Sequence, residues 1–273
     1  MNRHITEILI NTYGVDISGF DDTFVKKNIV QRMDKTGCID IAAYSRLVTE
    51  LEPEAGQFLE SLRISYTEFF RNSLSFSVFE RLLLPEIIYN KKNKKNKEIR
   101  IWSAACAAGQ EAYSIAMILE NFKWQNEKIK YRIFGTDSDE KQINLARGGK
   151  YTYESVGNVT LKQLERWFIK SGNTYSITPE LKKHCEFSVF DLLSKHTSPP
   201  DSIYGDFDMI LCANILFYYK PAFQKIILDK IYDSLAEDGL IITGEAEREL
   251  LKAGNFKEVF PQTAIFRKKQ KKA

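Results

Sequence analysis

Apolar residues recur at helical spacing along the first part of the chain. From Ile5 to about Arg71 they return every three or four positions, as at Val25 and Ile29, which is the period of one face of a helix. The segments YGVDISGF, KTGCID and LEPEAG separate these stretches and are typical of helix ends. The pattern predicts an all-helical domain over residues 1–72.

A second helix-rich stretch follows, from Thr67 to Tyr89. It ends in a run of lysine and asparagine, from Asn90 to Lys97. Blocks of like charge usually lie in solvent as loops, and a binding patch is the alternative. We expect residues 73–97 to form a helical linker and a basic loop before the next domain.

From about residue 98 short β-type runs alternate with amphipathic helical patterns. The runs are EIRIWSA, KYRIFGTD, CEFSVFD, FDMILCAN, GLIITGE and TAIFRK. Helical patterns lie between them, over residues 111–121, 140–148 and 222–235. This alternation predicts a parallel sheet with right-handed crossovers, that is, a doubly wound α/β domain over residues 98–273.

Residues 150–183 interrupt this rhythm. WFIKSGNTYSITPEL carries turn residues around Gly172, between two short runs of β type. The pattern predicts a small hairpin that is laid on the main sheet.

The composition is that of an ordinary soluble globular protein, with 44% hydrophobic and 27% charged residues among 273. A net charge of +3 is too weak to indicate a nucleic acid partner. No segment approaches the roughly 20 apolar residues that span a bilayer, and residues 1–14 lack a signal-peptide pattern. We expect a cytoplasmic protein without direct membrane insertion.

Four cysteines, Cys38, Cys106, Cys185 and Cys212, lie far apart and form no C-x-x-C pair. This spacing favours neither a zinc site nor a disulfide framework. We expect free, mostly buried thiols and no bound metal.

The first strand of the α/β region leads into a turn of small residues, SAACAAG, at residues 103–109. Small side chains let the backbone approach a ligand at the carboxyl end of a strand, where open α/β sheets bind ligands. Only Gly109 is a glycine, whereas a pyrophosphate needs the convergent N–H groups of a G-x-G-x-x-G run. The turn therefore fits a dinucleotide poorly.

The second strand ends in GTD, with Asp137 as its last residue. A carboxylate at this position can accept hydrogen bonds from both hydroxyls of a ribose. A small-residue loop, an acid and no phosphate cradle point to a nucleoside ligand without phosphates, of which S-adenosylmethionine is the common example. The alternative is that Asp137 only caps the helix that begins near Asp139.

Six motifs follow one another along the chain: YTEFFR, RIWSAACAAGQEAYSIAMIL, IFGTDSDEKQINLARGGKY, FSVFDLL, FDMILCANILFYY and DGLIITGEAE. Their order and spacing resemble those of the CheR-type chemotaxis receptor methyltransferases, from about Ile5 to Lys268. The resemblance implies an N-terminal helical domain, a Rossmann-like methyltransferase domain and a small antiparallel β-subdomain at about residues 150–186. It also implies methyl transfer from S-adenosylmethionine to glutamate carboxylates in the cytoplasmic helical domain of chemoreceptors.

The resemblance further implies roles for individual residues. Arg71 and Tyr218 are the implied catalytic residues: Arg71 would steer the anionic substrate or hold a cofactor carboxylate, and Tyr218 would lie near the transferred methyl group. Glu111 and Asp137 match acids that hold the methionine end or the ribose. The implied cofactor-binding residues are Ser65, Thr67, Arg71, Ala105, Glu111, Asp137, Asp191, Leu192, Asn214 and Ile215.

The implied reaction needs no general base, because a glutamate side chain, with a reference pKa of about 4.3, is already ionised at neutral pH. A chain with only three histidines, none inside these motifs, can therefore catalyse it by alignment. Holding the carboxylate, methyl and sulfur in line lowers such a barrier by roughly 7–11 kcal/mol.

Each of these residues also has a purely structural interpretation. The helix macrodipole favours Glu111 in a first turn, Asn214 is a common turn former, and Arg71 fits a surface ion pair. Tyr218 and Tyr219 fit core aromatic positions. Two other functions stay open: a methyltransferase with a different substrate, and a non-catalytic cofactor-binding signalling or scaffold protein.

The sequence departs from the family pattern in several places. In GQEAYS, Gln110 and Ala112 replace an acid and a proline, and Ala213 stands where the family has an arginine. The predicted helix at residues 24–35 corresponds to the one that faces the receptor in the family. Its basic residues spread around the helix axis, at about 100° per residue. They are Lys26, Lys27, Arg32 and Lys35. Their spread does not identify a receptor-binding face.

Overall fold

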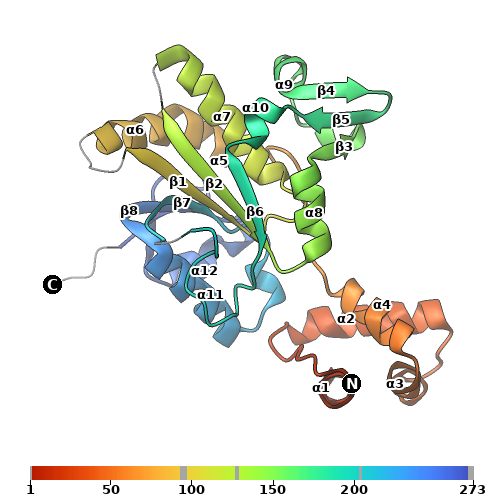
Figure 1. The fold of residues 1–273 in the computed structure, drawn as a ribbon. Coiled ribbons are helices and arrows are strands. Elements are labelled where there is room, and N and C mark those ends of the chain that lie inside the picture. The colour runs from red at the N-terminus through yellow and green to blue at the C-terminus, as the bar shows by residue number, and fades with distance from the viewer. Residues whose placement is uncertain (1, 93–96, 127–128, 203–204, 270–273) are drawn as a thin grey trace. The chain divides into compact units, whose positions relative to one another are not determined.

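The computed structural model describes residues 2–92, 97–126, 129–202 and 205–269 (Figure 1). By its internal contacts the chain divides into two compact units. The first consists of Met1–Ile64 with Ile215–Ile226, and the second of Ser65–Asn214 with Ile227–Ala273.

The first unit contains the predicted helices. They are α1 (Asn2–Tyr13), α2 (Asp22–Thr36), α3 (Ile41–Glu50) and α4 (Glu52–Ser61), with the 3₁₀ turn η3 (Leu216–Tyr218) and the start of α11 (Pro221–Ser234). Their core is built on fully buried side chains such as Ile5, Ile29 and Phe58. Gly37, with φ of 71°, ends α2 in the left-handed conformation, which explains the break predicted at KTGCID.

A buried ion pair lies inside this bundle. Arg32 donates from Nε and NH2 to the two carboxylate oxygens of Glu54, at 2.9 and 2.5 Å, and the Tyr44 hydroxyl donates to the same carboxylate at 2.9 Å. Arg32 is therefore not a surface residue, whereas Lys26 and Lys27 on the same helix are exposed.

The second unit is built on a seven-stranded sheet with the order β6-β2-β1-β7-β8-β10-β9. The strands are β1 (Glu98–Ala104), β2 (Lys130–Asp137), β6 (Cys185–Val189), β7 (Phe207–Leu211), β8 (Leu235–Ile242), β9 (Phe256–Glu258) and β10 (Ile265–Lys268). The first five strands in this order are parallel, which confirms the doubly wound α/β prediction. The last strand, predicted from TAIFRK, instead lies antiparallel between β8 and β9.

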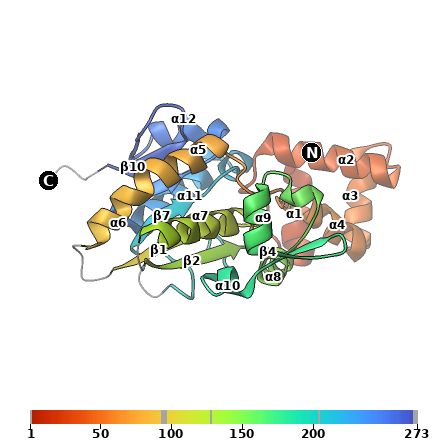
Figure 2. The same cartoon turned by 90° about the horizontal axis from the view of Figure 1, so that it is seen from above.

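Helices cover both faces of this sheet, and most residues of its central strands β1, β2 and β7 are accordingly buried. The helices are α5 (Ser73–Val78), a π-helical turn (Phe79–Leu83), α6 (Leu84–Lys92), α7 (Gln110–Asn126), α8 (Glu140–Gly148), η4 (Glu245–Glu247) and α12 (Arg248–Lys252). Figures 1 and 2 show α5, α6 and α7 on one side of the sheet. The C-terminal part of α11 lies on the other side.

The helical prediction was wrong around the junction of the two units. Helix α4 ends at Ser61 and α5 begins at Ser73, so the segment between them, Thr67 included, is not helical. The predicted basic loop was also wrong at its start, because α6 continues to Lys92. Lys91 is 5% exposed and its Nζ lies 2.9 Å from Asp208 Oδ2. Residues 93–96 of the run lie outside the described residues.

The predicted hairpin at Gly172 is confirmed. Strands β4 (Phe168–Ser171) and β5 (Thr174–Ile177) are antiparallel, and β3 (Lys150–Thr152) pairs with β5 to complete a three-stranded sheet. Gly172 has a φ of 58°, which suits the tight connection. The small sheet also carries η2 (Glu154–Val156), α9 (Leu161–Trp167) and α10 (Pro179–Lys182).

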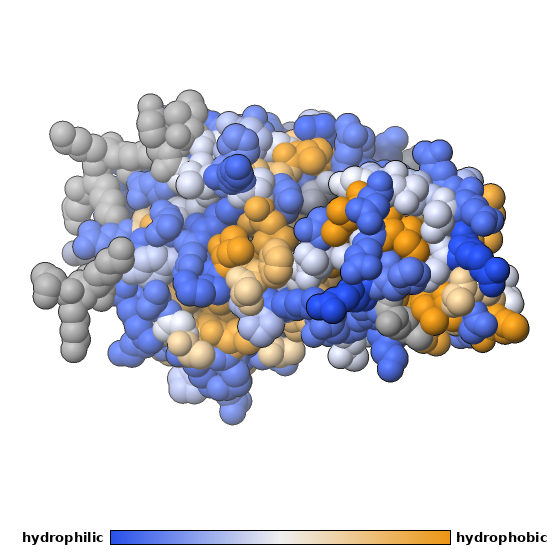
Figure 3. Space-filling view, turned by 90° about the horizontal axis from the view of Figure 1, so that it is seen from below, coloured by the Kyte–Doolittle hydropathy of each residue, from blue (hydrophilic) through white to orange (hydrophobic). Residues whose placement is uncertain are grey.

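Surface and cysteine features complete the fold. No helix among the described residues is both long and apolar enough to cross a membrane. Figure 3 shows one face, on which hydrophobic residues form separate patches among hydrophilic ones.

All four cysteines are free, with Cys106 and Cys212 buried and Cys38 and Cys185 partly buried.

The buried ion pair gives a first prediction. Glu54→Ala leaves Arg32 as an uncompensated buried charge, so we expect the free energy of unfolding to fall by roughly 3 kcal/mol or more. Chemical denaturation followed by circular dichroism measures the change. Glu60→Ala is the matched control, because its partner Arg63 is 3.1 Å away and both side chains are largely exposed. Its expected loss is below about 1 kcal/mol, and an equal loss for both variants contradicts the prediction.

Candidate active site

Strand order reverses between β1 and β7, because the chain passes from β1 to β2 on one side and later reaches β7 on the other. Open α/β sheets bind ligands at the carboxyl ends of the strands that flank such a point. Two of the predicted site residues, Ala105 and Asn214, directly follow these two strands. The topology thus supplies the location that the sequence motifs indicate.

The backbone at this edge adopts unusual conformations. Ala105, Ala107 and Asn214 have positive φ angles of 55°, 45° and 61°, and Phe70 has one of 51°. Such conformations cost on the order of 1–3 kcal/mol each for residues other than glycine, and they cluster at ligand sites. The surrounding structure therefore has to hold these residues in place.

Asp137 holds the loop after β1. Its Oδ2 accepts a hydrogen bond from Ala107 N at 3.0 Å, and its Oδ1 accepts one from Asp139 N at 2.9 Å. Burial raises the pKa of this carboxyl, and the backbone donors oppose the rise. The capping interpretation was wrong, because the N-cap of α8 is Asp139, whose side chain accepts from Lys141 N. Each Asp137 oxygen can still accept a further hydrogen bond.

The segment that contains Arg71 lies against the first turns of α7. Phe70 N donates to Ser114 Oγ at 3.0 Å, and Ser114 Oγ donates to Gln110 O at 2.8 Å. Phe69 is fully buried. Arg71 follows Phe70 and is thereby held near the first turn of α7. That turn carries Glu111, three residues before Ser114.

Glu111 carries the largest electrostatic perturbation among the predicted site residues. Although the residue is half-buried, burial of its carboxylate raises the pKa to about 7; the positive charge of Arg71 opposes the rise, and the negative charge of Glu247 adds to it. Glu247 is fully buried and was missed by the sequence analysis. The charges of Arg71 and Glu247 therefore both act on the Glu111 carboxyl.

Three buried side-chain oxygens in the segments that form this site have no hydrogen-bond partner among the described residues. They are Thr67 Oγ1, Ser103 Oγ and Gln110 Oε1. Buried polar atoms are nearly always paired, so these atoms are suited to the polar groups of a ligand. Thr67 was predicted as a site residue, whereas Ser103 and Gln110 were not.

The charges at this edge fit S-adenosylmethionine. Three carboxylates, those of Glu111, Asp137 and Glu247, accompany one guanidinium, that of Arg71. A ligand with a sulfonium, an ammonium, a carboxylate and a ribose offers complementary partners to this set. Arg71 is suited to the carboxylate, and Glu111 and Asp137 are suited to the positive and hydroxyl groups.

The remaining predicted residues lie in three places. Asp191 and Leu192, which the resemblance places beside the adenine, follow β6 close to Asp137, because Phe190 N donates to Asp137 O at 2.9 Å. Asp191 is exposed and Leu192 is buried. Ser65 is exposed at the start of the second unit.

Ile215 and Tyr218 belong to the first unit. Tyr218 O accepts a hydrogen bond from Asp21 N at 2.7 Å, and its ring centroid lies 4.7 Å from that of Phe24 in an edge-on arrangement. The Tyr218 side chain is half-buried, so both its structural interpretation and its proposed catalytic role stay open. The cluster around Glu111 contains neither residue.

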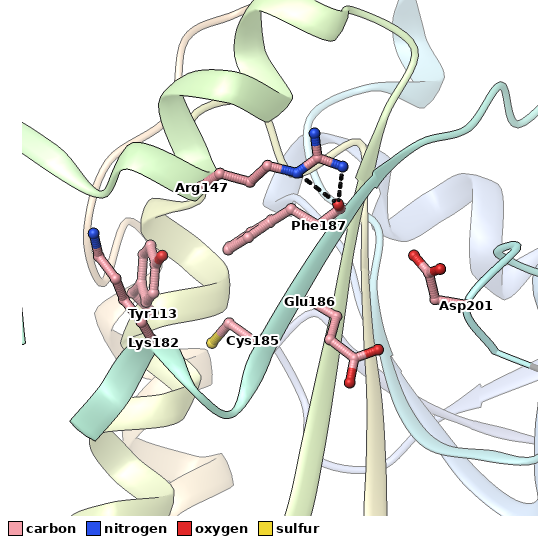
Figure 4. A pocket seen from close by; sticks show the side chains of 7 residues that line it. All are labelled: Tyr113, Arg147, Lys182, Cys185, Glu186, Phe187 and Asp201. Atoms are coloured by element: carbon pink, nitrogen blue, oxygen red, sulfur yellow. Dashed lines mark hydrogen bonds between the residues drawn. The ribbon is translucent and has the colours of Figure 1, made fainter. Parts of the chain in front are cut away.

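A separate cavity of about 390 Å³ opens at the β6 edge of the large sheet (Figure 4). It is lined by Tyr113, Arg147, Lys182, Cys185, Glu186, Phe187 and Asp201. Arg147 donates from Nε and NH2 to Phe187 O at 3.1 and 2.7 Å, which occupies a free carbonyl of the edge strand. None of the predicted site residues lines this cavity.

A comparison with protein families identifies the family of this chain. The family model described as "CheR methyltransferase, SAM binding domain" matches residues 65–265. The chain belongs to the CheR methyltransferase family. It is an S-adenosylmethionine-dependent methyltransferase, and the resemblance stated from the six motifs is confirmed, as is the cofactor. The individual site residues stay predictions.

Curated relatives agree with this family. The chain is 28% identical over 252 residues to a chemotaxis protein methyltransferase of Escherichia coli (strain K12), covering 90% of this chain and 83% of that protein. It is 27% identical over 247 residues to a chemotaxis protein methyltransferase of Listeria innocua, covering 90% and 89%. A TehB-like SAM-dependent methyltransferase structure from Corynebacterium glutamicum has a TM-score of 0.40 at 12% identity, with coverage of 80% and 95%. A likeness this remote carries no further argument.

The pKa of Glu111 gives a prediction about cofactor binding. A carboxyl with a pKa of about 7 is mostly ionised at pH 7.5 and mostly protonated at pH 5.5, and the positive groups of S-adenosylmethionine favour the ionised form. We therefore expect the dissociation constant to rise as the pH falls, approaching roughly tenfold per pH unit below the pKa. Isothermal titration calorimetry from pH 7.5 to 5.5 measures this.

Glu111→Gln supplies the control for this prediction. The variant has no titrating carboxyl at this position, so we expect weaker binding at pH 7.5 and little change over the same pH range. Parallel pH profiles for the wild-type protein and Glu111→Gln contradict the assignment of Glu111.

Proposed function

We propose that this CheR methyltransferase methylates glutamate side chains of chemoreceptors, forming glutamate methyl esters in sensory adaptation. The observation that carries the proposal is the match of residues 65–265 to the family's cofactor-binding domain. Relatives named as chemotaxis protein methyltransferases, which align over 90% of the chain, support the pathway. The proposed location is the cytoplasm, where the helical domain of these receptors lies.

The chemistry asks little of the protein beyond alignment. When bound, S-adenosylmethionine supplies a methyl group on a positively charged sulfur. The glutamate substrate is ionised at neutral pH, so no residue of this chain has to remove a proton. This agrees with a site made of carboxylates, one guanidinium and hydroxyl groups.

Arg71 has the central orienting role in this proposal. It lies in a segment that Ser114 ties to α7, and its positive charge acts on Glu111. Its planar fork suits a carboxylate, either that of the cofactor or that of the incoming glutamate. Asp137 would hold the ribose of the cofactor, and Glu111 would hold its positive end.

The partner that we propose is an acidic, helical segment of the receptor. Three lysines of α2, Lys26, Lys27 and Lys35, are exposed, whereas Arg32 is held in its buried ion pair with Glu54. The exposed lysines are available to carboxylates of a partner, and Arg32 is not.

A labelling experiment tests the substrate. We expect the purified protein to transfer a radiolabelled methyl group from S-adenosylmethionine to chemoreceptors in a membrane fraction, and the label to be released by mild base, as a glutamate ester is. Mass spectrometry of receptor peptides then locates the esters. Label that is stable to base, or that appears on RNA or a small molecule while receptors stay unlabelled, contradicts the proposal.

Two substitutions test the predicted site roles. Asp137→Ala removes acceptors at the end of β2, so we expect the dissociation constant for S-adenosylmethionine to rise by roughly tenfold or more. Tyr218→Phe should instead mainly slow methyl transfer while binding stays close to wild type. Calorimetry and initial rates separate the two effects. Asp139→Asn, which keeps the cap of α8, is the control, and wild-type behaviour of both test variants contradicts the assignments.

A further inference from the structure

Glu247 is a buried acid that the sequence motifs did not assign to the site. It ends the short turn η4 after β8 and is fully buried. Its Oε2 accepts hydrogen bonds from Asn214 N at 2.8 Å, Thr243 Oγ1 at 2.8 Å and Gly244 N at 3.0 Å. Buried polar groups are tolerated when they have such partners, and the fold supplies this carboxylate oxygen with three donors.

The bond to Asn214 is the one that concerns function. The donors of Thr243 and Gly244 are local, since both lie within four residues of Glu247. Asn214 is 33 residues away in sequence and follows β7 at the switch point. A local cap of η4 explains the first two bonds and does not explain the third.

Asn214 needs such a support because of its backbone. Its φ is 61°, in the left-handed region, which asparagine adopts more readily than most other residues apart from glycine but still at some cost. Gly244 packs directly against it: a Cβ atom on Gly244 would lie 2.7 Å from Asn214 Oδ1 and 3.0 Å from Asn214 N. The Glu247 carboxylate and the bare backbone of Gly244 together fix the position of Asn214.

We propose that Glu247 is a positioning residue for S-adenosylmethionine, which holds Asn214 in its cofactor-binding conformation through the hydrogen bond to Asn214 N. The inference deepens the proposed function and rests on Asn214 being a cofactor-side residue. Glu247 is not placed in contact with the cofactor. Its effect reaches the cofactor through the loop after β7.

The charge of Glu247 has a second, separable consequence. Glu111 interacts electrostatically with Arg71, with Glu247 and with the thiols of Cys106 and Cys212. Of these, Glu247 contributes to the raised pKa of Glu111. Removing its charge while keeping its shape therefore lowers the pKa of Glu111 and moves the pH profile of cofactor binding to lower pH.

Three variants separate these effects. Glu247→Gln keeps an acceptor oxygen for Asn214 N and loses the charge, whereas Glu247→Ala loses both. Thr243→Val removes one donor to the same carboxylate and leaves the Asn214 bond in place, so it is the matched control for stability. Calorimetric titration with S-adenosylmethionine, without any receptor, gives the affinities, and thermal unfolding by circular dichroism reports on the fold.

We expect Glu247→Ala to weaken cofactor binding by roughly tenfold or more. Glu247→Gln should stay within about threefold of wild type at pH 7.5, with its pH profile shifted to lower pH, and Thr243→Val should bind as the wild type does. Wild-type affinity in Glu247→Ala overturns the proposal, and so does an equal loss of affinity in Thr243→Val.

The experiment stays decisive in two difficult cases. Should Glu247→Ala fail to fold, Glu247→Asp decides: it keeps the charge, but its shorter side chain withdraws the carboxylate from Asn214 N, so wild-type affinity in this variant overturns the proposal. Should the wild-type protein bind S-adenosylmethionine but methylate no receptor, the proposed substrate fails while the role of Glu247 is still tested by binding alone.

Discussion

The site depends on buried carboxylates that accept hydrogen bonds from the backbone at the carboxyl edge of the sheet. Asp137 accepts from Ala107 N, and Glu247 accepts from Asn214 N. Each carboxylate therefore holds a residue with positive φ in the loop after a neighbouring strand. A charged acceptor with backbone donors forms roughly twice as strong a hydrogen bond as a neutral one. This strength can offset strain of on the order of 1–3 kcal/mol for each such residue.

A second constraint brings the guanidinium to the same edge. Phe69 is buried against the small sheet. Its ring centroid lies 4.9 Å from that of Tyr151 and 5.5 Å from that of Phe168. The Tyr151 hydroxyl in turn donates to Ala108 O at 2.7 Å. The three-stranded sheet thus packs the segment that contains Arg71 and also supports the loop after β1. The small sheet therefore contacts both segments of the site, through Phe69 on one side and through Ala108 on the other.

The sequence predicted the architecture well because strand and helix periods are local signals. It also placed Ala105 in the loop after β1 and Asp137 at the end of β2, where the structure has them, whereas their roles toward the cofactor stay predictions. It did not predict Glu247, because the bond to Asn214 spans 33 residues and leaves no periodic trace. Lys91 shows the same limit: the lysine run looked like a solvated loop, and only the fold reveals its partner Asp208.

Charge balance determines what such a site can accept. Burial is the main cause of the raised pKa of Glu111, and repulsion from the negative charge of Glu247 adds to it. A ligand with positive groups relieves this repulsion, whereas an anionic glutamate adds to it. The electrostatics therefore favour binding of S-adenosylmethionine before the proposed carboxylate substrate. They also give Arg71 its importance, because it is the positive charge in this cluster that can attract an anionic substrate.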